Sequence, residues 1–210
     1  MKTIVNPLIE QYMETLRTVA DDNLRAMERR AAAEDFPIVG PEVGMLLYLL
    51  VKIGGARRVL ELGSGYGYSA YWFALALPAG GQVIATDLDP IKKQYAERVF
   101  ARAGMSDKLH FVLGNGLEVI DNLDGPFDII FNDVDKEDYP DVIEKAAAKL
   151  RPGGLFITDN TLWYAKVVED PPPDETTVAV QCFNRSLAAH PQFEAQILPL
   201  RDGLTVAVRK

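Results

Sequence analysis

The sequence predicts a doubly wound α/β fold: a mostly parallel, seven-stranded sheet with an antiparallel C-terminal edge and added N-terminal helices. Two observations lead to this fold class. From residue 57 onward, short apolar runs alternate with longer stretches of helical spacing, as in parallel sheets covered by helices on both faces. The last two apolar runs are instead joined by a short turn, which predicts a closing hairpin.

Helices are expected in front of the sheet. Apolar residues at helical spacing predict one helix over about 7–33 and another over 42–53, which ends at Gly54 and Gly55. The second half of the first helix, DDNLRAMERRAAAED, is highly charged, so we expect it to be solvated or packed on a partner. The length fits one domain over 1–210, with 1–55 as a helical layer and 56–210 as the core.

The elements of the core follow in order along the chain. The expected parallel strands are 59–62, 83–86, 109–113, 127–131 and 155–158. The expected helices between them are 69–77, 90–103, 117–122 and 140–150. After a further helix near 176–189, the hairpin strands 193–199 and 204–209 flank the turn Arg201-Asp202-Gly203.

Composition excludes several classes of partner. The net charge of −8 argues against nucleic acid as the main partner, because neutralising phosphates requires a basic face. Cys182 is the only cysteine and cannot form an internal disulfide, which suits a reducing cytoplasm. No apolar run is long enough to span a bilayer, and the N-terminus lacks the features of a signal peptide. We therefore expect a cytoplasmic protein with neither a nucleic-acid nor a membrane partner.

A glycine-rich turn follows the first expected strand. Gly63, Gly65 and Gly67 permit positive φ angles and a close approach of a ligand to the backbone. The dinucleotide fingerprint would need glycine where Tyr68 stands, and no Lys-Ser/Thr pair follows, so a phosphate-binding P-loop is excluded. Glu61 would repel a pyrophosphate but suits a ligand that carries an ammonium and a sulfonium. The alternative is a tight strand-to-helix connection that binds nothing.

The next two strand ends also offer ligand contacts. A carboxylate at Asp87 can accept hydrogen bonds from both hydroxyls of a ribose. The alternative is that it caps the following helix, although Asp89 before Pro90 is better placed for that. The turn at 114–116 is open enough for an adenine. All these positions lie outside the carboxyl ends of the strands, near the expected reversal of strand order.

Oxygen ligands are concentrated after the fourth and fifth strands. Asp133, Asp135 and Lys136 follow one strand, and Asp159 and Asn160 follow its neighbour. Two carboxylates and an amide without nearby His or Cys suit Mg²⁺, Mn²⁺ or Ca²⁺ rather than zinc. The alternative is that these residues are exposed caps and turn formers. Lys136 is a candidate base if burial or a cation lowers its pKa.

Together these motifs resemble one family, the cation-dependent O-methyltransferases that include catechol and caffeoyl-CoA O-methyltransferases, above all its small bacterial members. The resemblance covers about 36–210 and implies a class I, Rossmann-like, S-adenosylmethionine-dependent methyltransferase. VLELGSGYGYSA is similar to the cofactor loop and ATDLDP to the ribose-binding strand end. FNDVDKEDY and TDNTLW are similar to the two metal segments, and LRDGLTVAVRK to the closing hairpin.

The resemblance implies a role for each matching residue. Asp87 would hold the ribose hydroxyls, and Asp135 would meet the amino group of S-adenosylmethionine. A divalent cation (Mg²⁺, or else Mn²⁺ or Ca²⁺) would bind Asp133, Asp159 and Asn160. Lys136 and Asp133 would be catalytic, with the lysine taking or orienting the proton of the acceptor. The full implied cofactor set is Val39, Glu61, Gly63, Ser64, Gly65, Ser69, Asp87, Leu88, Asn115, Gly116, Asp133 and Asp135.

The expected reaction is direct methyl transfer from sulfur to a hydroxyl of a small, catechol-like phenolic acceptor chelated by the cation. The alternatives are a metal-independent methyltransferase of the same fold and a binding module that has lost acceptor chemistry. The loop 163–177 is expected to cover the acceptor, and Tyr164 departs from the plant-type pattern. The family's dimers suggest a homodimer that packs through the charged N-terminal helix.

Overall fold

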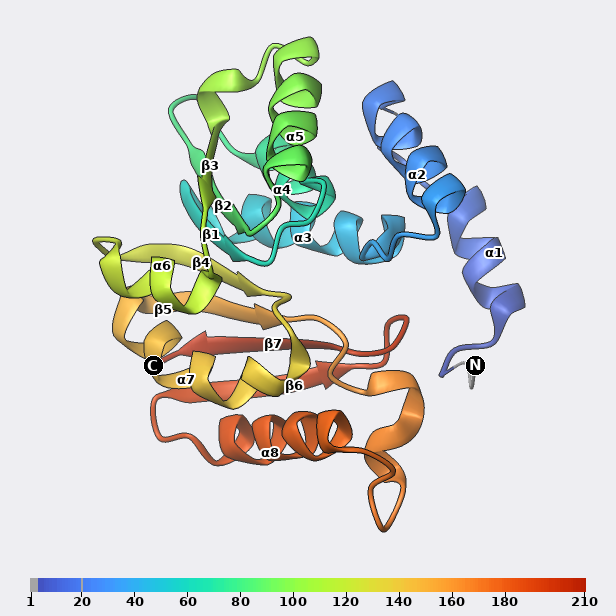
Figure 1. The fold of residues 1–210 in the computed structure, drawn as a ribbon, viewed down its shortest axis with the longest axis vertical. Helices are drawn as coiled ribbons and strands as arrows, with labels where there is room; N and C mark the ends of the chain where they lie inside the picture. The colour runs from blue at the N-terminus through green and yellow to red at the C-terminus, as the bar shows by residue number, and fades with distance from the viewer. Residues whose placement is uncertain (1–3, 20) are drawn as a thin grey trace.

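The computed structural model describes residues 4–19 and 21–210, so residues 1–3 and 20 of the expected N-terminal layer lie outside the described part. Seven strands form one sheet in the order β3-β2-β1-β4-β5-β7-β6 (Figure 1). This order and the strand directions confirm the predicted fold class. The parallel strands are β1 (Arg58–Leu62), β2 (Gln82–Asp87), β3 (Leu109–Leu113), β4 (Phe127–Asn132) and β5 (Leu150–Thr158), and the antiparallel edge is β6 (Phe193–Leu198) and β7 (Leu204–Arg209).

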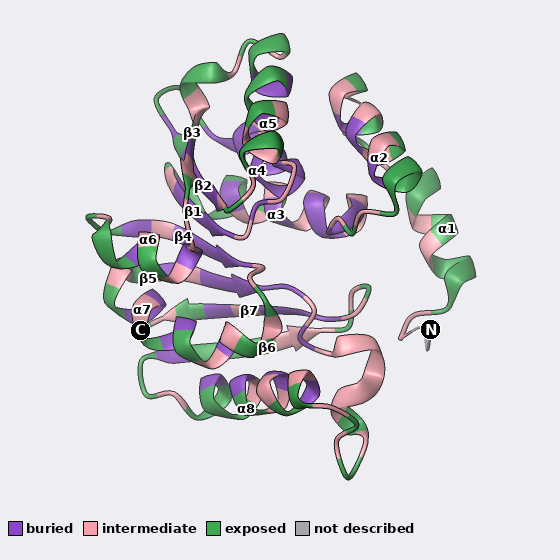
Figure 2. Cartoon of the chain, viewed as in Figure 1, coloured by how far each residue is buried: buried purple, intermediate pink, exposed green. Residues whose placement is uncertain are grey.

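Helices cover both faces of the sheet, because successive strand residues point to opposite sides. Val59 of β1 belongs to one apolar core, whereas its neighbour Leu60 belongs to the other. The first core also contains residues of α3 (Gly40–Gly54), α4 (Tyr68–Ala76) and α5 (Pro90–Arg102). The second contains residues of α6 (Gly116–Asn122), α7 (Tyr139–Lys149) and α8 (Glu175–Ala189). The central strands are accordingly buried along their length (Figure 2).

The expectation of one long N-terminal helix is wrong. The chain forms α1 (Pro7–Thr15) and α2 (Asp22–Glu34), and each has its own cap. The carboxylate of Asp21 accepts hydrogen bonds from the backbone N–H groups of Asn23 and Leu24, which starts a new helix inside the periodic stretch. The charged half is also the half that packs, since α2 buries Leu24, Met27 and Ala31 while α1 buries no residue.

The parallel strands all end at one edge of the sheet, where the site-bearing segments emerge. Leu62 at the end of β1 pairs with Thr86 of β2 on one side and with Asn132 of β4 on the other. Asn132 in turn pairs with Thr158 of β5. The strand order reverses between β1 and β4, which makes this edge a topological switch point. Within residues 4–19 and 21–210, no helix combines the length and apolar character needed to cross a membrane.

Candidate active site

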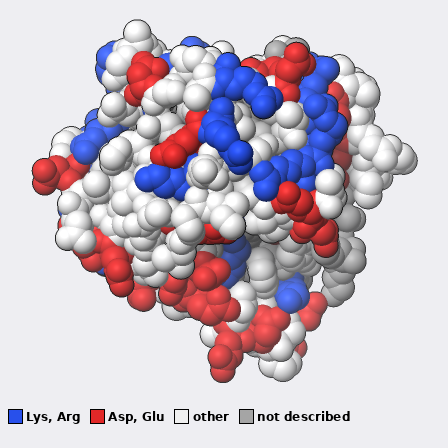
Figure 3. All heavy atoms as spheres, turned by 45° about the horizontal axis from the view of Figure 1, so that its top comes forward, with Lys and Arg blue, Asp and Glu red and all other residues white. Residues whose placement is uncertain are grey.

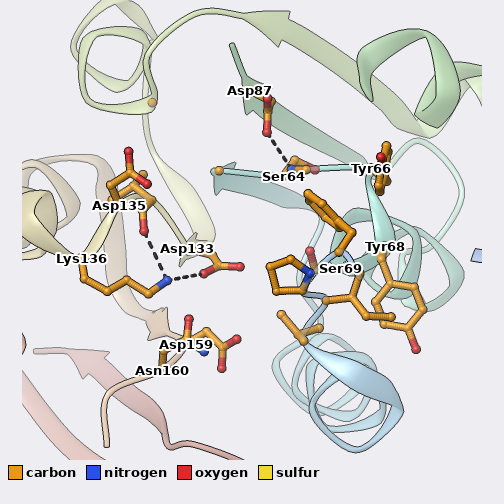
Figure 4. A pocket seen from close by; sticks show the side chains of 18 of the residues that line it. Ser64, Tyr66, Tyr68, Ser69, Asp87, Asp133, Asp135, Lys136, Asp159 and Asn160 are labelled. Atoms are coloured by element: carbon orange, nitrogen blue, oxygen red, sulfur yellow. Dashed lines mark hydrogen bonds and ion pairs between the residues drawn. The ribbon is translucent and has the colours of Figure 1, made fainter. Parts of the chain in front are cut away.

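A cavity of about 720 Å³ opens at the carboxyl ends of the parallel strands. Its volume lies in the range of small-molecule sites. Of the residues that the sequence predicts for cofactor, cation or catalysis, all line this main cavity except Glu61. Figure 4 shows two groups of polar side chains facing each other across it, with the residues of the glycine turn and Asp87 on one side and the Asp133–Asn160 group on the other.

The glycine turn packs directly against the chain that leaves β4. Gly63 has a φ of +83°, and a Cβ placed on it would overlap the carbonyl oxygen of Asp133 and stand 2.7 Å from its carbonyl carbon. Gly65 and Gly67 also have positive φ angles, +54° and +81°. Glycine at position 63 is therefore required by conformation and by space.

Gly63→Ala is expected to lower the free energy of unfolding by at least about 2 kcal/mol, because the side chain adds a backbone clash to an unfavourable φ. Urea denaturation monitored by circular dichroism measures this loss. Gly54→Ala is the matched control, since a Cβ at this last residue of α3 meets no atom within 4 Å. Equal stability of the two variants would contradict the close-approach argument.

Glu61 lies beneath the turn and is fully buried. Its carboxylate accepts hydrogen bonds from the hydroxyls of Ser64, at 2.7 Å, and of Ser69. Burial is the main cause that raises the pKa of Glu61 to about 7, and the two serine hydroxyls oppose that shift. The charges of Asp133 and Asp87 raise it further. A cation bound in the cavity would therefore favour the ionised carboxylate.

Asp87 faces the cavity and braces the glycine turn. Its Oδ2 accepts a hydrogen bond from the backbone N–H of Gly65 at 2.9 Å, and Lys92 Nζ lies 3.4 Å from Oδ1. The cap of α5 is Asp89, whose side chain accepts the N–H of Ile91 at 2.7 Å, as the sequence favoured. Asp87 is thus not used as the helix cap.

The turn after β3 borders the cavity on the same side as the glycine turn and Asp87. The side chain of Asn115 caps α6 by accepting the N–H of Leu117 at 2.8 Å. A Cβ on Gly116 would stand 3.2 Å from Leu62 Cβ and from Thr86 Oγ1, so the turn lies close against β1 and β2. Leu88 is exposed at the rim of the cavity.

The opposite half holds the acidic and amide residues together, as predicted from adjacent strand ends. Lys136 Nζ donates a hydrogen bond to Asp133 Oδ1 at 3.0 Å. It also lies 5.2 Å from the centroid of the Tyr139 ring. Asp159 is 4% exposed, and its backbone carbonyl accepts a hydrogen bond from the Tyr139 hydroxyl. The Lys136–Asp133 pair and the two residues after β5 are labelled in Figure 4.

The two carboxylates are close enough to disturb each other's ionisation. Burial raises the pKa of Asp159 well above its ordinary value, and the charges of Asp133 and Asp202 raise it further. Burial likewise raises the pKa of Asp133, although the neighbouring Lys136 opposes that shift. This corner of the cavity therefore carries more negative charge than one lysine balances, which a divalent cation would relieve.

Asp202 also belongs to this group, although the sequence predicts it only as part of a turn. The amide nitrogen of Asn160 donates to both of its carboxylate oxygens, at 3.0 and 2.9 Å. The backbone carbonyl of Asp202 also accepts the N–H of Leu162 at 2.8 Å. With its nitrogen fixed in this way, the amide oxygen of Asn160 is left as the atom available to a ligand.

The donor set fits a hard cation. Among the described residues no cluster of three or more carboxylate, imidazole or thiolate ligands is found, so a cation held by Asp133 and Asp159 would take a further protein ligand from a neutral oxygen such as that of the Asn160 amide. Mg²⁺ takes oxygen ligands, keeps several waters, and is commonly held by only one or two carboxylates. Two carboxylates and an amide oxygen are therefore sufficient.

A strained segment borders the acidic corner. The helical turn η3 (Trp163–Val168) has positive φ angles at Trp163, Tyr164 and Ala165, of +45°, +53° and +62°. Such angles cost on the order of 1 kcal/mol each in residues other than glycine. Tyr164 lines the main cavity, and its ring centroid lies 5.5 Å from that of Trp163.

Comparisons with known proteins agree with this geometry. A family model described as O-methyltransferase matches residues 12–210. A catechol O-methyltransferase from Niastella koreensis is 32% identical over 96% of each chain, and caffeoyl-CoA O-methyltransferase 1 from Eucalyptus globulus is 35% identical over 79% of this chain and 72% of its own.

Solved structures give the same result. An O-methyltransferase from Bacillus cereus in complex with S-adenosylhomocysteine superposes with a TM-score of 0.87 at 32% identity, over 97% of both chains. An O-methyltransferase from Streptomyces achromogenes involved in tomaymycin synthesis, solved with S-adenosylmethionine, gives a TM-score of 0.88 at 29% identity, over 96% of both chains.

Proposed function

The chain belongs to the O-methyltransferase family and is an S-adenosylmethionine-dependent O-methyltransferase, and from this premise we propose that it methylates a hydroxyl of a small catechol-like acceptor with the help of a divalent cation. The observation that carries the proposal is the oxygen cluster across the main cavity from the glycine turn, made of the buried Asp159 and the half-buried Asp133 and Asn160. The names of the catechol and caffeoyl-CoA relatives support an acceptor with adjacent hydroxyls.

The cofactor half of the cavity would hold S-adenosylmethionine through groups that match its charges. Glu61 and Asp135 favour the positively charged methionine end, and Asp87 is placed for the ribose hydroxyls. The other proposed contacts are Val39, Gly63, Ser64, Gly65, Ser69, Leu88, Asn115, Gly116 and Asp133. The sulfonium of the bound cofactor supplies an activated methyl group, so the protein needs no covalent intermediate.

The acceptor half would hold the cation through Asp133, Asp159 and Asn160. A bound divalent cation supplies Lewis acidity, which lowers the pKa of a coordinated hydroxyl. Asp202 keeps the Asn160 amide in one orientation. Lys136, held 3.0 Å from Asp133, is placed to take or steer the proton that leaves the hydroxyl. The segment 163–177 would form the wall beside the acceptor.

The requirement for a cation is tested with a pair of matched acceptors. With 3,4-dihydroxybenzoate, we expect turnover to fall by at least about a hundredfold after chelation and to return when Mg²⁺ is added, because the cation lowers the pKa of the reacting hydroxyl. With 4-hydroxybenzoate, which lacks the adjacent hydroxyl, we expect little turnover in either state. Product formation followed by mass spectrometry measures both.

Other outcomes of this assay would point elsewhere. Undiminished turnover in excess chelator would favour a metal-independent methyltransferase of the same fold. Binding of S-adenosylhomocysteine without turnover over a broad panel of phenols would favour a binding module.

One domain over 1–210, a homodimer and a cytoplasmic location stay predictions. The molar mass measured by light scattering tests the homodimer.

A further inference from the structure

A second hollow, of about 250 Å³, lies between α2 and α5, apart from the cofactor and acceptor positions. We call it the arginine groove and define it by Asn23, Arg30, Tyr95, Arg98 and Arg102. The first two belong to α2 and the other three to α5, at spacings that place each set on one helix face. The groove is therefore formed by two helix faces turned toward each other.

The groove is positively charged although the chain as a whole is negative. Arg98 and Arg102 are exposed, and within the described residues neither has a hydrogen bond, ion pair or aromatic contact. They stand four residues apart on one helix, where like charges repel. No acidic side chain lines the groove. In Figure 3 most of the Lys and Arg side chains gather over the upper part of the molecule, with some Asp and Glu among them, whereas the lower part shows mainly Asp and Glu.

Arg30 joins the groove to the glycine turn. Its guanidinium carbon lies 4.0 Å from the ring centroid of Tyr95 and 4.4 Å from that of Tyr66, so it is stacked between the two rings. Tyr66 belongs to the glycine turn and lines the main cavity. The ring of Phe36, just beyond α2, lies 4.4 Å from that of Tyr66 and lines the same cavity. The two hollows thus share a wall.

Among the described residues, Arg30 interacts with Glu34 and with the hydroxyl side of Tyr66. Its Nε donates to Glu34 at 2.8 Å, and Glu34 also accepts a hydrogen bond from the Tyr66 hydroxyl. The side chain of Arg30 is 27% exposed. The guanidinium N–H groups that Glu34 and Tyr66 leave unused are available to a ligand in the groove.

We propose that the arginine groove binds a phosphate or diphosphate group. Guanidinium groups bind phosphate oxygens through paired hydrogen bonds, and three of them line a hollow too small for a macromolecule. An anion there would relieve the repulsion between Arg98 and Arg102 and would draw α2 toward α5. Because α2 leads directly into Phe36 and the wall of the main cavity, we expect the anion to tighten cofactor binding.

The test titrates inorganic pyrophosphate into protein saturated with S-adenosylhomocysteine, in chelator and at constant ionic strength. The bound product fills the cofactor half of the main cavity, and without a cation the carboxylates of the acceptor half repel an anion, so the heat of binding reports on the groove. We expect a saturable site whose dissociation constant rises at least about tenfold in the double variant Arg98→Gln/Arg102→Gln. The matched control is Arg25→Gln/Arg29→Gln, which removes two exposed arginines of α2 that do not line the groove.

Two results would overturn the site: no saturable binding by the parent protein, or equal weakening in the control variant. Unchanged binding of S-adenosylhomocysteine without pyrophosphate shows that both variants are folded. Adenosine diphosphate, titrated in the same way, distinguishes the sources of the phosphate. A dissociation constant well below that of pyrophosphate identifies a nucleotide, and an equal one identifies the inorganic anion.

The coupling to the cofactor has its own measurement. We expect saturating pyrophosphate to lower the dissociation constant of S-adenosylhomocysteine about fivefold in the parent protein and to leave it unchanged in Arg98→Gln/Arg102→Gln. An equal effect in both proteins would overturn the coupling. Neither experiment uses an acceptor or a cation, so its result is independent of the catechol proposal.

Discussion

Asp159→Asn is expected to lower kcat/KM for a catechol about a thousandfold, which corresponds to about 4 kcal/mol of lost transition-state stabilisation. The substitution removes one of only two carboxylates proposed for the cation. It keeps the shape of the side chain and removes a buried charge, so it should not weaken the fold. The measurement is the initial rate of methyl transfer as a function of acceptor and Mg²⁺ concentrations.

Two control measurements test whether the loss of activity is specific to the proposed cation site. Binding of S-adenosylhomocysteine should stay within about twofold of the parent, because Asp159 is not among the proposed cofactor contacts. Asp141→Asn, on the exposed side of α7, should leave the rate unchanged. A variant Asp159→Asn that kept the parent's rate and its response to Mg²⁺ would remove this carboxylate from the mechanism.

Glu61→Gln is expected to change stability and cofactor affinity in opposite directions. Burial raises the pKa of Glu61 from 4.5 to about 7 in the folded protein. Between these two pH values the empty folded protein keeps a proton that the unfolded chain releases, so stability falls as the pH rises. The loss amounts to about 3 kcal/mol and is complete above pH 7. The glutamine variant has no such loss.

Urea unfolding of the cofactor-free proteins at pH 5 and pH 8 measures the effect. We expect the variant to gain stability relative to the parent as the pH rises between these values. Calorimetry at pH 8 should show S-adenosylhomocysteine binding weakened by about a hundredfold, because the buried carboxylate no longer balances the ligand's positive charge. A stability difference that is the same at both pH values would contradict the shifted pKa.

Most of the fold could be predicted from the sequence because the central strands are buried on both faces and the strands read as short apolar runs. The predicted strand 109–113 coincides with β3, and the predicted hairpin strand 204–209 coincides with β7. The break between α1 and α2 was missed because apolar spacing continues across it. The cap at Asp21 is a local hydrogen-bond preference that periodicity does not register.

The candidate site, too, could be predicted only in part from the sequence. The residues after β1, β2, β4 and β5 could be brought together in advance, because the ends of parallel strands meet at one edge. Asp202 could not be assigned to the site in advance. It lies beside Asn160 because β7 is the neighbour of β5 in the sheet, and residue spacing along the chain does not reveal that neighbour. The stack of Arg30 between Tyr66 and Tyr95 likewise joins three elements that no sequence spacing connects.

The reversal of strand order between β1 and β4 has a consequence for how this enzyme can be altered. The proposed cofactor contacts lie mainly on the β1, β2 and β3 side, whereas the proposed acceptor contacts lie on the β4, β5 and β7 side. The two sides meet most closely where Gly63 lies against Asp133. Laboratory evolution toward new acceptors can therefore randomise the 163–177 segment while the methyl-donor half is inherited unchanged.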